Sequence, residues 1–198
     1  GIALNERAVL QHAAVFGMGF NVNLLFSLIE SRGMDPGQLH SALENAITRL
    51  IIVPTEKGHY LFTHESIKNK LYSELTSDAL QALHQATGLI LWSQRNQETG
   101  LDYEIANHLS RGFVDRNPET VFEAHFRAGS LATEDLDNDA AYRYLSLGAS
   151  VARSSKLKMS PQFLLALGEA CLLTSRPNEA LKVLVEGLEF CDLPVLRA

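Results

Sequence analysis

Apolar residues recur with the period of an α-helix along the first fifty residues. Breaks in this period predict three helices, over residues 6–16, 24–31 and 35–50. The third helix has a strong start signal in Asp35 followed by Pro36, because an acid caps free N–H groups and proline fits the first helical position. This helix should bury one apolar stripe, formed by Leu39, Leu43, Ala46, Ile47 and Leu50.

Two short runs of β-prone residues follow the third helix. Residues 51–53 and 59–62 are rich in Ile, Val, Tyr and Phe, and the segment between them contains Pro and Gly, which predicts a β-hairpin. Thr63 should then cap a helix over residues 64–75. Three helices, a hairpin and a fourth helix in this order are typical of a winged helix, so we predict a winged-helix-like domain over residues 1–76.

From residue 77 onward the sequence predicts only helices. Ser77, followed by Asp78, should cap the first of these helices, and Asn138 or Asp139 should begin the fourth. Ser160 and Arg176 each precede a proline and begin two more. The first four are expected over residues 77–94, 102–110, 117–133 and 138–153. The predicted fold class is therefore mainly α, with one β-hairpin followed by an array of helical hairpins.

The last four predicted helices contain an internal repeat. A shift of 39 residues aligns small or apolar positions with one another, namely Gly129 with Gly168, Ala132 with Cys171, Ala141 with Ala180, Leu145 with Leu184, and Gly148 with Gly187. This pattern fits a tetratricopeptide-like hairpin, whose usual period is about 34 residues, with the additional residues at 154–158. We predict connecting helices over residues 77–116 and tetratricopeptide-like repeats over residues 117–198.

The composition is that of a globular protein. The 198 residues are 46% hydrophobic and 20% charged, and the net charge is −6. No apolar run approaches the roughly 20 residues that span a bilayer, and the start has no signal-peptide pattern, so we expect a cytoplasmic protein with no membrane partner. Cys171 and Cys191 occupy apolar helix positions and should be buried free thiols. The abrupt start at Gly1 and the end at Ala198 suggest a piece of a longer protein.

The sequence contains no residues with the spacing of a known catalytic or metal site. Its seven histidines include no H-E-x-x-H pair, and neither a G-x-S-x-G elbow nor a G-x-x-x-x-G-K-[ST] phosphate loop occurs. The acidic run at residues 134–139 lacks the glycine and final glutamate of an EF-hand, which favours a solvated turn. We expect no enzymatic activity, no metal and no cofactor in this chain.

Four segments resemble, in order, a family of large bacterial signalling ATPases of the STAND type. Members fuse an ATPase module to Ser/Thr kinases, histidine kinases, adenylate cyclases or LuxR-like regulators. Residues 6–17, with Phe20 as the next anchor, look like the opening helix of the family. The others are residues 60–67 followed by Leu71 and Tyr72 ("F-x-H-D-x-I/V … A-Y"), residues 83–91 ("L-H-x-x-I-G-x-L-L") and residues 104–112 ("I-x-N-H-L-x-x-G"). In this family a winged helix follows the nucleotide-binding domain, and helical repeats follow the winged helix.

The resemblance implies a nucleotide-sensing role for His64. In related switch ATPases, a histidine after the winged-helix hairpin reaches the β-phosphate of bound ADP and holds the closed state. ATP or ADP would bind to an upstream nucleotide-binding domain outside this chain, and a protein or small-ligand effector would bind to the repeats. Glu65 departs from the aspartate usual in the family. The alternative is that His64 only caps its helix or packs on the hairpin.

Two other functions fit the same architecture. A winged helix can bind DNA through its third helix, but the exposed positions there and on the wing offer few cations, which disfavours nucleic acid as a partner. These positions are Gln38, His40, Ser41, Glu44, Asn45, Arg49 and, on the wing, Lys57. The other function is a scaffold, in which the repeats bind a partner peptide and the winged-helix-like domain has no active role.

Overall fold

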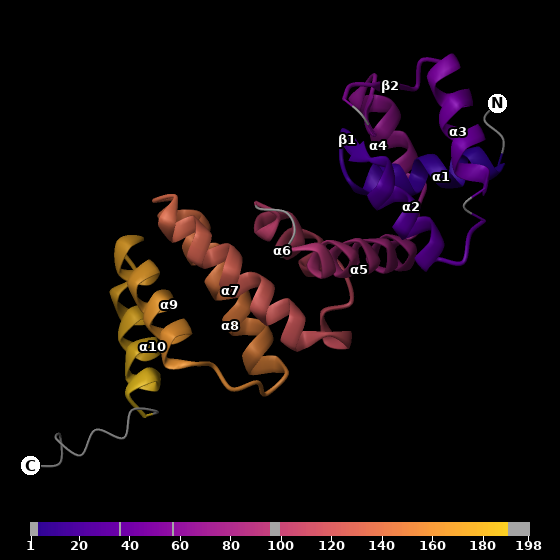
Figure 1. Ribbon diagram of the computed structural model, residues 1–198. Coiled ribbons are helices and arrows are strands. Elements are labelled where there is room, and N and C mark those ends of the chain that lie inside the picture. The colour runs from indigo at the N-terminus through magenta and orange to yellow at the C-terminus, as the bar shows by residue number, and fades with distance from the viewer. Residues whose placement is uncertain (1–3, 36, 57, 96–99, 190–198) are drawn as a thin grey trace, which may run out of the picture. The chain divides into compact units, whose positions relative to one another are not determined.

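The computed structural model describes residues 4–35, 37–56, 58–95 and 100–189, and these are mainly helical with one small antiparallel sheet (Figure 1). The predicted fold class, mainly α with a β-hairpin, is confirmed. The chain divides into two compact units, Gly1–Glu98 with Arg111–Phe113, and Thr99–Ser110 with Val114–Ala198. Each unit has its own core. The predicted division at residues 76 and 116 stays a prediction.

The first unit builds four helices and a sheet around one core, and a fifth helix packs on them. Its elements are α1 (Leu4–Val15), β1 (Gly19–Asn21), α2 (Val22–Ser31), α3 (Gly37–Thr48), β2 (Ile52–Pro54), β3 (His59–Phe62), α4 (Glu65–Ser73) and α5 (Ser77–Gln94). The core takes side chains from α1 to α4 and from all three strands, among them Val9, Leu10, Phe20, Leu25, Ile29, Leu43, Ile52, Phe62 and Leu71. Leu83 of α5 packs against Val15 and Leu28.

The sheet has three strands in the order β1-β3-β2, all antiparallel. The predicted hairpin is present, with Ile52 opposite Phe62. The additional strand β1 pairs Gly19 with Leu61. Three residues are too few to give a visible period of two, so sequence periodicity did not reveal this strand. A Cβ on Gly19 would lie 2.8 Å from Leu61 Cδ2, so a glycine there permits the close pairing.

Several predicted helix ends in the first unit are wrong by one or two residues. Leu50 was expected on the buried stripe of α3, but it follows the helix with a φ of 54° and is 69% exposed. Thr63 does not cap α4, because its hydroxyl donates to the carbonyl oxygens of Leu50 and Ile51 at the end of the hairpin. His64 holds the N-cap position instead. The cap of α5 is Thr76, one residue before the predicted Ser77.

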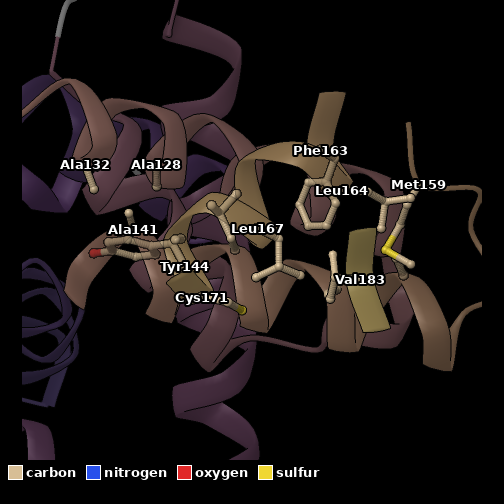
Figure 2. Packing of buried hydrophobic residues seen from close by; sticks show 14 of the residues in the cluster. Ala128, Ala132, Ala141, Tyr144, Met159, Phe163, Leu164, Leu167, Cys171 and Val183 are labelled. Atoms are coloured by element: carbon tan, nitrogen blue, oxygen red, sulfur yellow. The ribbon is translucent and has the colours of Figure 1, made fainter. Parts of the chain in front are cut away.

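The second unit consists of helices that pack in sequence. They are α6 (Asp102–Arg111), the short 3₁₀ helix η1 (Val114–Arg116), α7 (Pro118–Glu134), α8 (Asn138–Ser154), α9 (Pro161–Leu173) and α10 (Pro177–Glu189). Ser160 caps α9 through its hydroxyl, as predicted. The cap of α8 is Asp137, not Asn138 or Asp139, since the Asp137 carboxylate accepts from the Ala140 N–H. Figure 2 shows the core that α7 to α10 share.

The 39-residue repeat is confirmed at the level of individual atoms. A Cβ built on Gly129 would lie 2.5 Å from the Leu145 side chain, and one on Gly168 would lie 2.5 Å from that of Leu184. The turns repeat as well, because Leu136 and Ser175 have φ values of 60° and 61°. These turns close each helix with the hydrogen-bond pattern of a Schellman motif. The two hairpins therefore share the geometry of their turn and of their closest helix contact.

Three findings complete the description of the chain. Among the described residues, no helix is long and apolar enough to cross a membrane. Cys171 is a buried free thiol on α9, as predicted. Pro36, Lys57 and Cys191, to which the sequence analysis also assigned positions, lie outside the described residues.

Replacing Gly129 or Gly168 with alanine should lower the free energy of unfolding by about 1–3 kcal/mol, because the new methyl group would overlap the leucine of the next helix. Gly187→Ala is the matched control. Its added Cβ would be 3.5 Å from the nearest atom, so helix propensity should leave it neutral or up to about 1 kcal/mol more stable. Urea unfolding followed by circular dichroism measures all three, and equal midpoint shifts would contradict close packing as the cause.

Candidate functional site

A cavity of about 330 Å³ lies among α8, α9 and α10 in the second unit, and it is the candidate binding site of the helical repeats. Residues at helical spacing on α8 form one wall, α9 contributes an apolar floor, and α10 forms the other wall. The lining residues are Tyr142, Ser146, Ala149, Arg153, Leu167, Cys171, Glu179, Lys182 and Val183, and we call this site the repeat groove. The sequence analysis did not identify it.

Tyr142 is held firmly at one end of the repeat groove. Its hydroxyl donates to Glu179 Oε2 at 2.8 Å, and the Arg176 guanidinium lies 3.9 Å from the centre of its ring. The hydrogen bond to Glu179, together with burial, raises the pKa of the Tyr142 phenol. This phenol therefore remains a neutral hydrogen-bond donor at physiological pH.

The charged residues of the repeat groove leave one cation without a partner in the described part of the chain. Arg153 Nη2 lies 3.0 Å from Glu186 Oε2, which neutralises it. Lys182 forms no ion pair with any described residue. Its ammonium is exposed on α10. Glu179 of the same lining also has no ion pair with a described residue, so these two charges offset each other and the rim favours an uncharged ligand.

The only thiol at the repeat groove is in a chemically inert setting. Cys171 is 1% exposed, and burial, followed by the charge of Glu179, raises the pKa of its thiol. A thiol in this state is a poor nucleophile. No group of three or more His, Cys, Asp or Glu side chains in the described ranges could hold a metal ion. An apolar floor with a few polar groups at the rim is typical of a ligand-binding site.

His64, the histidine singled out from the sequence, lies exposed in the first unit at the N-terminus of α4. Its backbone is extended, with φ −140° and ψ 136°, and its side chain forms no capping hydrogen bond. The imidazole also has no hydrogen bond to any other residue that the structure describes. His64 therefore holds the N-cap position without a capping bond from its side chain, and both the nucleotide-sensing role and the structural alternative stay predictions.

A second cavity, of about 460 Å³, follows α4 beside α1, but its charges are already paired. Arg7 donates through Nε to Glu74 Oε2 at 2.9 Å, and Lys70 Nζ lies 3.6 Å from Glu74 Oε1. The hydrogen bond from Arg7 lowers the pKa of the Glu74 carboxyl, so the cluster remains ionised. Glu74 thus contacts both cations of this cavity and offsets one of their two positive charges, which weakens any attraction for phosphate.

Two residues of the quoted sequence motifs meet in the core of the first unit. The Tyr72 hydroxyl forms a hydrogen bond of 2.8 Å with His84 Nε2, and His84 is 2% exposed. Burial, followed by the charge of Arg111, lowers the pKa of His84 to about 4. These two motif positions therefore have a structural role.

The outer face of α3 has few free charges for a nucleic-acid backbone. His40 Nε2 pairs with Glu44 at 3.1 Å, and Arg49 Nη1 lies 3.6 Å from the buried Glu6 carboxylate. Ser41 and Asn45 are exposed beside them. The only arginine on this face is thus already engaged with an acid.

Comparisons of the chain with models of known protein families, with curated proteins and with solved structures found no match.

The pKa of His84 predicts a pH-dependent stability. In the unfolded chain this histidine binds a proton near pH 6.5, whereas in the folded unit it stays neutral down to about pH 4. Its contribution is complete above pH 6.5 and declines as the pH falls toward 4. Between pH 7 and pH 5, His84→Gln should lose about 2 kcal/mol less unfolding free energy than the parent chain in urea titrations. Equal losses in both chains would contradict this.

Proposed function

We propose that this chain is a non-enzymatic, cytoplasmic regulatory segment of a larger ATPase-linked signalling protein. In this proposal the first unit is a winged helix that docks on an upstream nucleotide-binding domain and reports whether ATP or ADP is bound. The second unit is a tetratricopeptide-like array that receives a protein or small-ligand signal. The observation that carries the proposal is the exposed, unpartnered imidazole of His64 at the start of α4, among the described residues.

The position of His64 suits contact with a phosphate that another domain supplies. An imidazole N–H donates to a phosphate oxygen, and the bond strengthens when the ring is protonated. The N-terminus of a helix adds a partial positive charge, so α4 reinforces the same preference. Movement of the winged helix away from the nucleotide would break this bond, which couples domain position to nucleotide state.

The surface of the second unit supports a role in protein interaction. Several large apolar side chains on α9 and α10 are about half exposed or more, and exposed apolar side chains of this kind can form contact sites. These side chains are Leu165, Leu172, Leu173, Leu181, Val185 and Leu188. The repeat groove lies on the same helices. A scaffold that binds partners through its repeats, without nucleotide sensing, is the second candidate function and rests on this surface alone.

The test of nucleotide sensing uses the intact protein. A Walker A loop encoded upstream of Gly1 is the first expected finding. His64→Ala should then weaken ADP retention about tenfold or more and raise basal output, because one hydrogen bond to a charged phosphate is lost. Radiolabelled ADP dissociation measures the retention.

The matched control for this test is His40→Ala, which removes another exposed histidine of the same unit from α3. ADP dissociation and basal output should match the parent protein. If His64→Ala also leaves both unchanged, the sensing proposal is overturned and the scaffold function remains. DNA binding at low salt with a steep salt dependence would favour a transcription regulator instead.

A further inference from the structure

The helix α10 exposes three large aliphatic side chains on one of its sides. Leu181, Val185 and Leu188 are separated by four and three residues, so they lie on the same side of the helix. Each is between 47% and 64% exposed. The terminal repeat of a helical array has a polar outer face, because only water covers it. This side of α10 therefore has the composition of a covered surface rather than a terminal one.

The 39-residue register shows what covers the same side of the preceding hairpin. The three positions align, in order, with Tyr142, Ser146 and Ala149 of α8. All three line the repeat groove, whose other walls come from α9 and α10. Tyr142 bonds Glu179 and lies beneath the guanidinium of Arg176, so α8 uses this side to hold the next hairpin. The exposed side of α10 is thus equivalent to a side that, in the first hairpin, faces two further helices.

The first helix of each hairpin shows the same difference. Phe126 of α7 packs edge-on against Phe163 of α9, with the ring centres 5.3 Å apart, and Phe163 is fully buried. The register aligns Phe126 with Leu165 of α9, which is exposed. The closest glycine–leucine contact is the same in both hairpins, so aligned side chains leave the two hairpins on the same side. Four aligned positions therefore face a neighbour in the first hairpin and are apolar but exposed in the second.

Two other exposed leucines of α9 do not belong to this side. Leu172 and Leu173 align with Thr133 and Glu134 of α7, which are exposed as well. The register thus separates the exposed leucines into two groups. Only the group that matches the contacts between consecutive hairpins is expected to be covered by the array itself, and the other group remains available to a partner.

We propose that a third helical hairpin of the same repeat, carried by the same polypeptide beyond α10, packs on the exposed side of α9 and α10. Its first helix would lie against this side as α9 lies against α7 and α8. A large apolar residue of that helix would contact Leu165, as Phe163 contacts Phe126. We call this side the stacking face, and its residues are Leu165, Leu181, Val185 and Leu188. The inference goes beyond the proposed function and rests only on the helical array.

A second copy of the chain does not offer such a helix from its described repeats. The corresponding side of α7 is bonded to α6, since Ser110 Oγ lies 2.8 Å from His125 Nε2. The corresponding side of α9 is packed on Phe126. The described repeats therefore provide no second surface of the kind that α9 presents to α8, which favours a further hairpin over self-association.

The sequence encoded after Ala198 is the first test. Two amphipathic helices are expected within about 40 residues. A small residue is expected 39 positions after Gly168 and another 39 positions after Ala180, because these positions lie at close or buried helix contacts. An encoded stretch without this pattern, or an end of the coding sequence at Ala198, would overturn the proposal.

The second test introduces a charge into the stacking face. Leu181→Glu in the intact protein should speed hydrogen–deuterium exchange of the α10 amides at least about tenfold, because a covered carboxylate without a partner loosens the contact with the third hairpin. Val185→Glu should have the same effect. In the 198-residue chain neither substitution should change exchange by more than about twofold, because both side chains already face water.

The matched control is Leu147→Glu, because Leu147 is an exposed leucine of α8 outside the stacking face. The register aligns it with Glu186 of α10, so the hairpin accommodates a glutamate at this position. Exchange of α8 and α10 should match the parent, both in the intact protein and in the 198-residue chain.

Three results would contradict the third hairpin. One is equal exchange in the parent and Leu181→Glu forms of the intact protein. Another is concentration-dependent association of the 198-residue chain that Leu181→Glu abolishes, which would assign the stacking face to a second copy. The last is protection of α10 that arises only when a different protein is added. None of these results alters the ADP dissociation test of His64, which concerns the other unit.

Discussion

The close approach of paired helices at a glycine is the contact on which the second unit depends. At Gly129 and again at Gly168, the leucine of the next helix occupies the space that a Cβ would need. Interiors are packed to near-crystalline density, so one additional carbon at such a point forces the helices apart. Because the same contact recurs 39 residues later, both hairpins share one backbone frame. The differences between them then lie in the side chains that fill that frame.

The two hairpins fill this frame with different side chains. Where the first has Ala128 and Tyr144, the second has Leu167 and Val183, so a larger residue on one helix offsets a smaller one on the next. The first unit distributes its polar groups differently. His84 is buried and bonded to Tyr72, whereas the His64 side chain is exposed and has no hydrogen bond to a described residue. Of these two histidines from the quoted motifs, one is therefore part of the core and the other lies at the surface.

Predictions from neighbouring residues were wrong where a residue interacts with a segment that is distant in the sequence. Thr63 has the chemistry of an N-cap, but its hydroxyl bonds the carbonyl oxygens of Leu50 and Ile51, which the hairpin brings within reach. Leu50 has the correct spacing for the stripe of α3, but the helix ends two residues earlier and the chain turns with a positive φ. Strand β1 exists because β3 provides a partner for residues with little strand signal of their own.

The sequence by itself determined the succession of helices, the hairpin and the 39-residue register. Periodicity, start signals and self-alignment are properties of neighbouring or regularly spaced residues, so they can be read along the chain. Only the tertiary structure decided that His64 is exposed, that Arg7 and Lys70 share Glu74, and that α8, α9 and α10 enclose a groove. Each of these depends on which side chains from separate segments meet. Packing between helices sets the distances among these side chains, and local sequence signals do not specify that packing.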